Sequence, residues 1–282
     1  MFIAKNKETG ELVYIDEADA AMEYICPVCE QPVVIKNGNV VTSHFAHKAK
    51  TMCDTFSHDM SEWHKWWQAQ FPKRNQEHVE ELTLSVGDYY RAAIKHGFLS
   101  KEVDDFCAKN SWDTIATLKH RADVRANGYI IEFQNSPIGM HEFNERNWFY
   151  QQIGCKVVWI FNLIPDNQKG NLLYRGYPLR GHGKHYEWKY KKATFKTFFP
   201  QDYAKDLSVE ESKNKSVIVF FQFVDYDATQ AGTGIVEQVV WAPPLKTHGI
   251  TSTRFSDFSE FATNKKSLSP RDFKKAIINK EL

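Results

Sequence analysis

Two carboxylates and one amide lie within a few residues of a turn signal in the middle of the chain. The dipeptide Asn127-Gly128 stands between two runs with strand character, and Asn-Gly is the strongest short signal for a two-residue β-hairpin turn. Asp123 lies four residues before this dipeptide and Glu132 four residues after it, so the two carboxylates are expected close together across the hairpin. Glu132 and Gln134 are two positions apart and therefore share one face of the second strand. Such a group predicts a site for a divalent metal ion that supports phosphodiester chemistry.

A second interpretation makes Asp123 and Glu132 an ordinary exposed pair on neighbouring strands. Like charges that face each other across a ladder repel unless a cation lies between them. Ile131 and Phe133 alternate with the polar positions and are expected to face a core. We therefore favour a metal site, with Mg²⁺ or Mn²⁺ as the ion.

A second group of residues, near the N-terminus, has the spacing of a zinc site. A Cys-x-x-Cys pair and a His-x-x-His pair are separated by fourteen residues that are typical of a tight hairpin. The four residues are Cys26, Cys29, His44 and His47. A hairpin would bring both pairs to one end, where they form a closed, structural set of ligands for tetrahedral Zn²⁺. Cys53 and His58 are substitute ligands, and the alternative is a set of buried cysteines and surface histidines without a metal.

The composition narrows the class of protein. The 282 residues exceed one typical domain, and the net charge of +1 provides no global basic field, so affinity for nucleic acid must come from local patches. Five cysteines, two of them in Cys-x-x-Cys, favour reduced thiols and a metal over disulfides. No apolar run reaches membrane-spanning length and the first twenty residues are charged, so we expect a soluble cytoplasmic protein without a membrane partner.

The hydrophobic pattern predicts the elements that hold these residues. A first hairpin is expected over 2–5 and 12–15. The elements that follow are a helix over 58–71, a strand over 79–86, the two strands around residues 127–128, a helix over 140–152 and a buried strand over 156–161. A helix over 101–108 is expected within an insertion before the central hairpin. This order of helix, three strands, helix and strand indicates a mixed α/β (α+β) fold.

The residues around the turn also carry a family resemblance. Asp123, followed after eight residues by Glu132-Phe133-Gln134, resembles the signature of the PD-(D/E)XK nuclease superfamily, with Gln134 in place of lysine. The segments R-A-D-V, I-E-F-Q-N-S-P-I and V-V-W-I, together with the N-terminal Cys and His pairs, resemble the CoiA-like family of competence proteins over roughly residues 20–162. The resemblance implies a restriction-endonuclease-like core over 58–164 with an N-terminal zinc-ribbon-like module over 1–57. An α+β region over 165–282 would follow.

The resemblance implies roles for further residues. His64 and Ser61 match the family pattern on the first helix, whereas Met60 and Gln68 depart from it. Glu80 is expected to assist the metal in preference to Glu81. The residues expected to contact or position the substrate are Ser136, Arg146 and Tyr150. The alternatives are a structural His64, and an Arg146 that is paired with an acid such as Glu142.

The last third of the chain carries no catalytic motif. Residues 165–183 are rich in Gly, Asn and Pro and are expected to form a linker or long loop. Residues 184–196 interleave aromatic rings with lysines, a composition that suits single-stranded nucleic acid but is equally typical of a strand with a lysine-rich face. Strands over 217–224 and 234–241 and helices over 256–265 and 269–280 are expected.

The favoured function is therefore a Mg²⁺- or Mn²⁺-dependent endo- or exodeoxyribonuclease. Asp123 and Glu132 would hold the metal, and the main-chain carbonyl of Phe133 would be a further oxygen ligand. Gln134 can orient water but offers no charge. The alternative is a catalytically weak or inactive nucleic-acid-binding protein, or an interaction subunit of a recombination or defence complex. The expected partners are DNA, including single-stranded or branched DNA, and protein partners in such a complex, and a homo-oligomer stays open.

Overall fold

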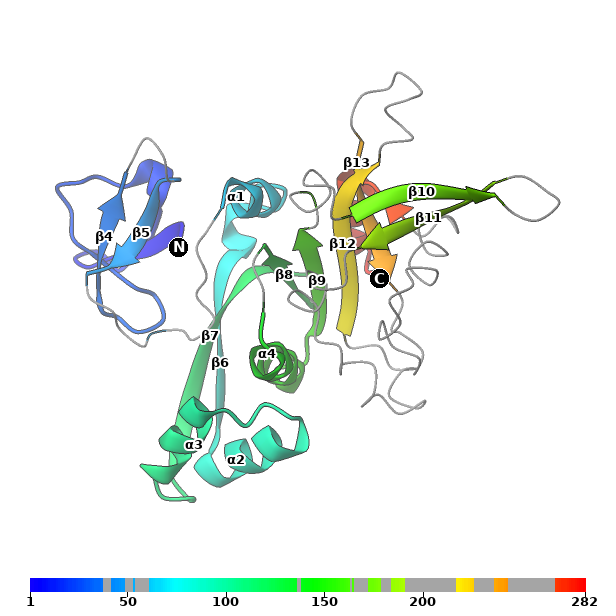
Figure 1. The fold of residues 1–282 in the computed structure, drawn as a ribbon. Coiled ribbons are helices and arrows are strands. Elements are labelled where there is room, and N and C mark those ends of the chain that lie inside the picture. The colour runs from blue at the N-terminus through cyan, green and yellow to red at the C-terminus, as the bar shows by residue number, and fades with distance from the viewer. Residues whose placement is uncertain are drawn as a thin grey trace. The chain divides into compact units, whose positions relative to one another are not determined.

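The computed structural model describes residues 1–37, 42–48, 53, 61–135, 138–162, 164, 172–178, 184–190, 217–225, 236–242 and 267–282 (Figure 1). The chain divides into two compact units. The first contains Met1–Arg91 and Asp104–Arg125, and the second contains Ala92–Val103 and Ala126–Leu282. The expected boundaries at residues 57 and 164 follow sequence motifs and stay a prediction.

The first unit begins with a small antiparallel sheet of order β2-β1-β3-β4-β5. Its strands are β1 (Ile3–Asn6), β2 (Leu12–Tyr14), β3 (Tyr24–Ile25), β4 (Pro32–Lys36) and β5 (His44–His47). Ile3 pairs with Tyr14, which confirms the expected first hairpin. A short 3₁₀ helix, η1 (Ile15–Glu17), follows β2. Buried side chains of this sheet and of its connecting segments form one cluster made up of Phe2, Ala4, Ile15, Tyr24, Cys26, Val28, Val33 and Phe45.

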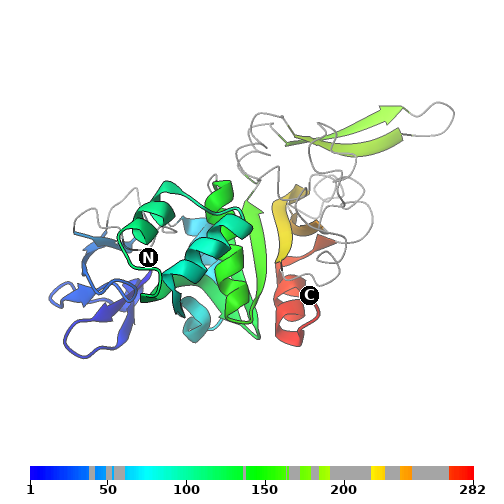
Figure 2. The same cartoon turned by 90° about the horizontal axis from the view of Figure 1, so that it is seen from below.

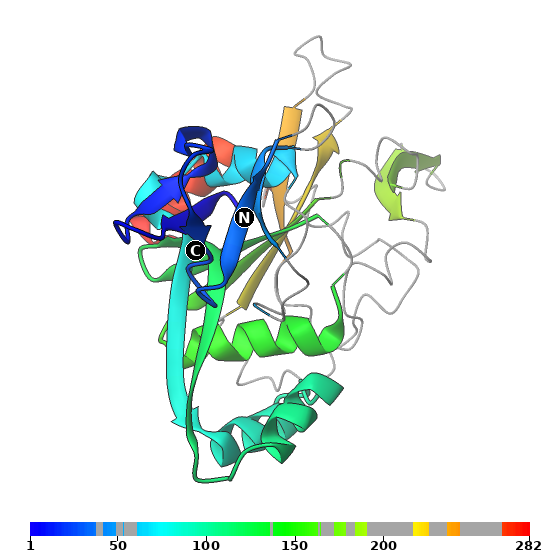
Figure 3. The same ribbon diagram turned by 90° about the vertical axis from the view of Figure 1, so that its left-hand side faces the viewer.

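The same unit contains a helix and two long strands. Helix α1 (Glu62–Gln68) begins after Ser61, whose side chain accepts a hydrogen bond from the backbone N–H of His64, as an N-cap residue does. The helix had been expected over 58–71, and residues 58–60 lie outside the described part of the chain. After a 3₁₀ turn, η2 (Lys73–Asn75), strand β6 (Gln76–Ser85) pairs antiparallel with β7 (Ile115–Ala126), and both run side by side in Figures 1 and 3. Between them in sequence lie α2 (Val86–Lys95) and α3 (Lys101–Ala108), the latter as expected.

The backbone at Asn127-Gly128 has the conformation that the sequence predicts. Strand β7 ends at Ala126 and β8 (Tyr129–Gln134) begins two residues later. Asn127 has φ 51° and Gly128 has φ 88°, and positive φ at both central residues is the signature of a type I′ turn. The Asn127 side chain donates to the carbonyl oxygens of Ile277 and Ile278, at 3.4 and 3.0 Å.

The second unit holds strands in the order β14-β13-β12-β9-β8. Helix α4 (Met140–Gln152) connects β8 to the parallel strand β9 (Lys156–Asn162), which is the usual way to join parallel neighbours. The remaining strands are β12 (Val217–Asp225), β13 (Val236–Ala242) and β14 (Ser267–Leu268). Helix α9 (Pro270–Asn279), red in Figure 2, packs on β12 through a contact between the rings of Phe273 and Phe220 at 5.1 Å. These elements confirm the expected helix over 140–152 and the buried strand after it.

The prediction of a linker over residues 165–183 is wrong where the structure describes this segment. Strand β10 (Leu172–Pro178) pairs antiparallel with β11 (Lys184–Tyr190) as a separate two-stranded sheet. The apolar run Leu172-Leu173-Tyr174 has strand character, and a two-stranded ribbon has only edges, so it tolerates Gly176 and the terminal Pro178. The expected helix over 256–265 lies outside the described residues.

The described elements follow the predicted order of helix, three strands, helix and strand, with α2 and α3 inserted after the first strand. The chain therefore has a mixed α+β fold. Within the described residues, no helix combines the length and the apolar character that crossing a membrane requires.

Candidate functional site

Three cysteines and one histidine of the first unit form a compact group of metal-ligating atoms. The members are Cys26, Cys29, His47 and Cys53, whose ligand atoms all lie within 4.8 Å of one another. The Sγ atoms of Cys26 and Cys53 are 3.4 Å apart, and Cys29 Sγ lies 3.2 Å from Nε2 of His47. Three thiols and one imidazole are a donor set of structural zinc sites, and four protein ligands leave no open position.

Tight local structure shapes the Cys-x-x-Cys turn after β3. Cys26 donates its backbone N–H to the carbonyl of Gln31, and Glu30 donates to the carbonyl of Cys26, both at 2.9 Å. Glu30 adopts a left-handed backbone with φ 58°, which lets the chain reverse into β4. The N–H of Val28 points at Cys26 Sγ at 3.4 Å, a contact that stabilises a thiolate.

The group differs from the expected ligands in its fourth member. Cys53 takes the place that the sequence spacing assigned to His44, and Cys53 had been named as a substitute. His44 and His47 are three residues apart on strand β5, so their side chains leave opposite faces of the strand. Nδ1 of His44 instead lies 2.7 Å from the carbonyl oxygen of Thr42. His58, the other substitute, lies outside the described residues.

The electrostatics of the thiols suit a metal. A hydrogen bond from the Cys53 thiol lowers the pKa of Cys26, while the same pairing and burial raise the pKa of Cys53. A bound Zn²⁺ would hold both sulfurs as thiolates. The residues present therefore fit zinc.

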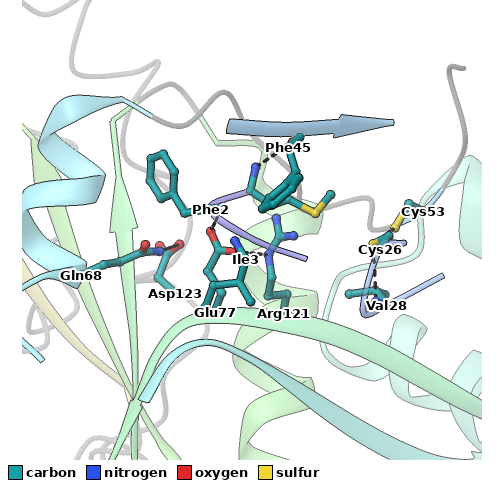
Figure 4. A network of polar contacts seen from close by, with 11 residues as sticks. Phe2, Ile3, Cys26, Val28, Phe45, Cys53, Gln68, Glu77, Arg121 and Asp123 are labelled. Carbon is teal, nitrogen blue, oxygen red and sulfur yellow. Dashed lines mark hydrogen bonds and ion pairs between the residues drawn. The ribbon is translucent and has the colours of Figure 1, made fainter. Parts of the chain in front are cut away.

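A buried carboxylate ties the N-terminal sheet to strand β6 (Figure 4). Oε1 and Oε2 of Glu77 accept hydrogen bonds from the backbone N–H groups of Phe2 and Ile3, at 2.7 and 3.0 Å. Nε of Arg121 lies 4.0 Å from the same carboxylate. Glu77 has φ 44° and falls at the position opposite Asp123, since Gln76 pairs with Val124 and His78 with Ala122. Glu77 is not among the predicted site residues, because the strand was expected to begin at residue 79 and β6 begins at Gln76.

Asp123 lies beside helix α1. Its Oδ1 accepts a hydrogen bond from Nε2 of Gln68 at 3.3 Å (Figure 4). His64, one turn earlier on α1, is buried, and its Nδ1 lies 2.9 Å from Oγ of Ser61. The polar side chains of His64 and Gln68 on α1 are thus both buried.

Glu80 is the buried member of the Glu80-Glu81 pair, and its role beside a metal stays a prediction. Its oxygens lie 2.9 Å from Nδ1 of His78 and 3.0 Å from Nη1 of Arg125. Glu81 is exposed and pairs with Lys119 at 2.7 Å. Glu80 therefore has two basic partners within the first unit.

In the second unit, Glu132 is held by an arginine. Nη1 of Arg146 donates to Oε2 of Glu132 and Nη2 donates to Oε1 of Glu142, both at 2.7 Å. The structure thus contains the pairing with Glu142 that was the alternative to a substrate contact, and adds Glu132 to it. Gln134 and Tyr150 are buried, and Ser136 lies outside the described residues. A cation that binds at Glu132 has to compete with a guanidinium.

Comparisons with known proteins gave two matches. Residues 10–56 match the family described as competence protein CoiA, N-terminal domain. Residues 113–180 match the family described as competence protein CoiA, nuclease-like domain. A search of curated proteins and a search of solved structures each gave no match. The first range covers all four grouped metal ligands, and the second covers Asp123, Glu132 and Gln134. Both matches are to regions of one family and follow each other in sequence order, so they support the resemblance of the chain to the CoiA-like competence proteins.

Proposed function

We propose that this chain is a divalent-metal-dependent deoxyribonuclease that acts on DNA in competence, with Asp123 and Glu132 as its metal ligands. The observation that carries the proposal is the match to the nuclease-like domain over residues 113–180, because this range contains both carboxylates. The positive φ angles of Asn127 and Gly128 support it further, since a two-residue turn keeps the register from which the site was predicted.

The residues divide the chemistry between them. Mg²⁺ or Mn²⁺ bound by the two carboxylates would lower the pKa of a water ligand and stabilise charge on the scissile phosphate. Gln134, two positions after Glu132, would orient that water through its amide. Gln68 donates to Asp123 and would hold this carboxylate in one orientation.

The test is cleavage of labelled DNA by the full chain in Mg²⁺, Mn²⁺ or EDTA. Single-stranded, duplex and branched substrates identify the preferred strand form, and a closed circular substrate separates endonuclease from exonuclease action. We expect Asp123→Ala and Glu132→Ala each to lower the metal-dependent rate at least about a hundredfold, because the metal supplies most of the stabilisation of the transition state.

Glu81→Ala is the matched control, since Glu81 is an exposed acid that pairs only with a surface lysine among the contacts described here. It should cleave at the wild-type rate. Full activity in both Asp123→Ala and Glu132→Ala, in protein purified away from other nucleases, would exclude this site.

A second candidate function is DNA binding without cleavage. It is favoured by the pairing of Glu132 with Arg146, which competes with a metal for this carboxylate, and by Gln134, which supplies no positive charge to the reacting phosphate. Binding that weakens steeply with salt, with no cleavage in either metal, would support this function over the first.

A further inference from the structure

Arg146 is the centre of a buried group of charges in the second unit. Its guanidinium donates to Glu132 and to Glu142, each at 2.7 Å. The side chains of Arg146 and Glu132 are 4% and 2% exposed, and that of Glu142 is 22% exposed. One guanidinium thus faces two carboxylates, where the loss of any partner costs far more than at the surface.

The position of the guanidinium is fixed by a third contact. Its central carbon lies 5.8 Å from the centre of the Trp159 ring, which attracts a cation. Trp159 is the register partner of Glu132 on β9, and its Nε1 donates to Oδ1 of Asn147 at 2.8 Å. The planar fork of arginine matches both carboxylates at once, so the charge stays at one place beside Glu132.

Strand β8 itself provides no positive charge beside Glu132. Gln134 is 2% exposed, and its side chain is an amide that carries no charge. Arginine stays protonated throughout the pH range in which proteins are folded.

We propose, resting on the nuclease function above, that Arg146 is the internal counter-ion of this site. It neutralises Glu132 before a divalent metal binds, and it keeps a positive charge beside that carboxylate which Gln134 cannot provide. Arg146 is thus a positioning residue. It contacts the proposed metal ligand Glu132, whereas the sequence predicted a contact with the substrate.

The proposal predicts two opposite effects of removing the charge. The metal and the guanidinium compete for the same carboxylate, so a neutral side chain at position 146 should tighten metal binding. The same change removes a cation from the reacting region and should slow cleavage. An arginine with only a structural role would weaken both properties when it is removed.

The experiment uses the full chain with Arg146→Gln, Arg146→Lys and Glu142→Gln. Mn²⁺ affinity is measured by calorimetry, and cleavage is measured on labelled linear DNA. We expect Arg146→Gln to bind Mn²⁺ about tenfold more tightly and to cleave roughly a hundredfold more slowly, the size of effect seen when one stabilising charge or donor is lost. Arg146→Lys should keep most of the rate. Arg91→Gln is the control, because Arg91 is exposed and pairs with Asp88 at 2.7 Å.

Glu142→Gln provides a second test of the proposal if the metal-free Arg146→Gln protein does not fold. This change leaves Arg146 to Glu132 and removes a nearby negative charge, so Mn²⁺ affinity should fall several-fold. Unchanged affinity in Glu142→Gln, or wild-type cleavage in a folded Arg146→Gln, would overturn the role of Arg146 alone. Wild-type protein that neither binds Mn²⁺ nor cleaves DNA would overturn the nuclease function and this inference together.

Discussion

The carboxylate of Glu77 accepts a 2.7 Å hydrogen bond from the backbone N–H of Phe2, 75 residues earlier in the chain. A second bond from Ile3, at 3.0 Å, occupies its other oxygen. Val79, two residues further along β6, packs against the apolar cluster of the N-terminal sheet. The N-terminal sheet and strand β6 therefore fold as parts of one compact unit, which also contains Asp123.

Glu77→Ala should destabilise the protein by about 2–4 kcal/mol, because two buried N–H groups each lose an acceptor at roughly 1–3 kcal/mol apiece. Glu77→Gly removes the same carboxylate but relieves the left-handed backbone at φ 44°, so it should cost about 1 kcal/mol less than alanine. Urea denaturation followed by tryptophan fluorescence measures both. Equal stability of the two variants would show that the backbone at this position is not strained.

Cys53→Ser should abolish stoichiometric zinc binding, whereas His44→Asn should retain it. Cys53 Sγ lies in the ligand group and the His44 ring does not. Elemental analysis of the purified proteins gives the zinc content directly. Loss of zinc from His44→Asn with retention in Cys53→Ser would restore the ligand set that the spacing alone suggests.

Removing the zinc should unfold the N-terminal sheet, because structural zinc sites contribute much of the folding free energy of small domains. We expect a strong chelator to expose the β1–β5 segment to limited proteolysis, with protection restored by added Zn²⁺. The amino-acid sequence, including Glu77, is unchanged in this experiment, so cleavage after chelation reports on the metal site itself.

Gly128→Ala should destabilise the turn by about 1 kcal/mol through its backbone alone. No atom lies within 4 Å of a Cβ built at this residue, while its φ of 88° disfavours any L side chain. Asn127→Gly should keep the turn but lose the side-chain bonds to Ile277 and Ile278. Thermal unfolding compares the two, and a neutral Gly128→Ala would contradict the type I′ assignment.

Tyr14 should make the first unit sensitive to alkali. Its hydroxyl donates to the carbonyl of Lys73, and burial together with Glu77 and Glu17 raises its pKa to about 12. A pKa raised in the folded state stabilises the fold below the ordinary value of 10.0, and this contribution is lost as pH rises from 10.0 towards 12. Tyr14→Phe lacks the hydroxyl. The difference in unfolding free energy between wild type and Tyr14→Phe should therefore be smaller above pH 10 than at pH 8.

Local features of this chain were determined by sequence alone. The Asn127-Gly128 turn, the helix α4 and the continuous apolar strand β9 follow from turn chemistry and hydrophobic period, which act within a few residues. Side chains alternate between the two faces of a strand, so His44 and His47, three residues apart on β5, point to opposite faces and do not bind one metal together. The His-x-x-His spacing predicts this only once the segment is known to be a strand.

Only the tertiary structure decided which distant side chains meet. Cys53 joins the cysteine turn 27 residues before it, and Glu77 accepts a hydrogen bond from Phe2, 75 residues earlier. Arg146 contacts Glu142, one turn away on its own helix, and also Glu132 on strand β8. Helical spacing predicts only the pairing with Glu142. Such contacts depend on packing between elements. Burying a charged or polar group costs free energy unless a partner lies beside it, and the tertiary fold determines which partner that is.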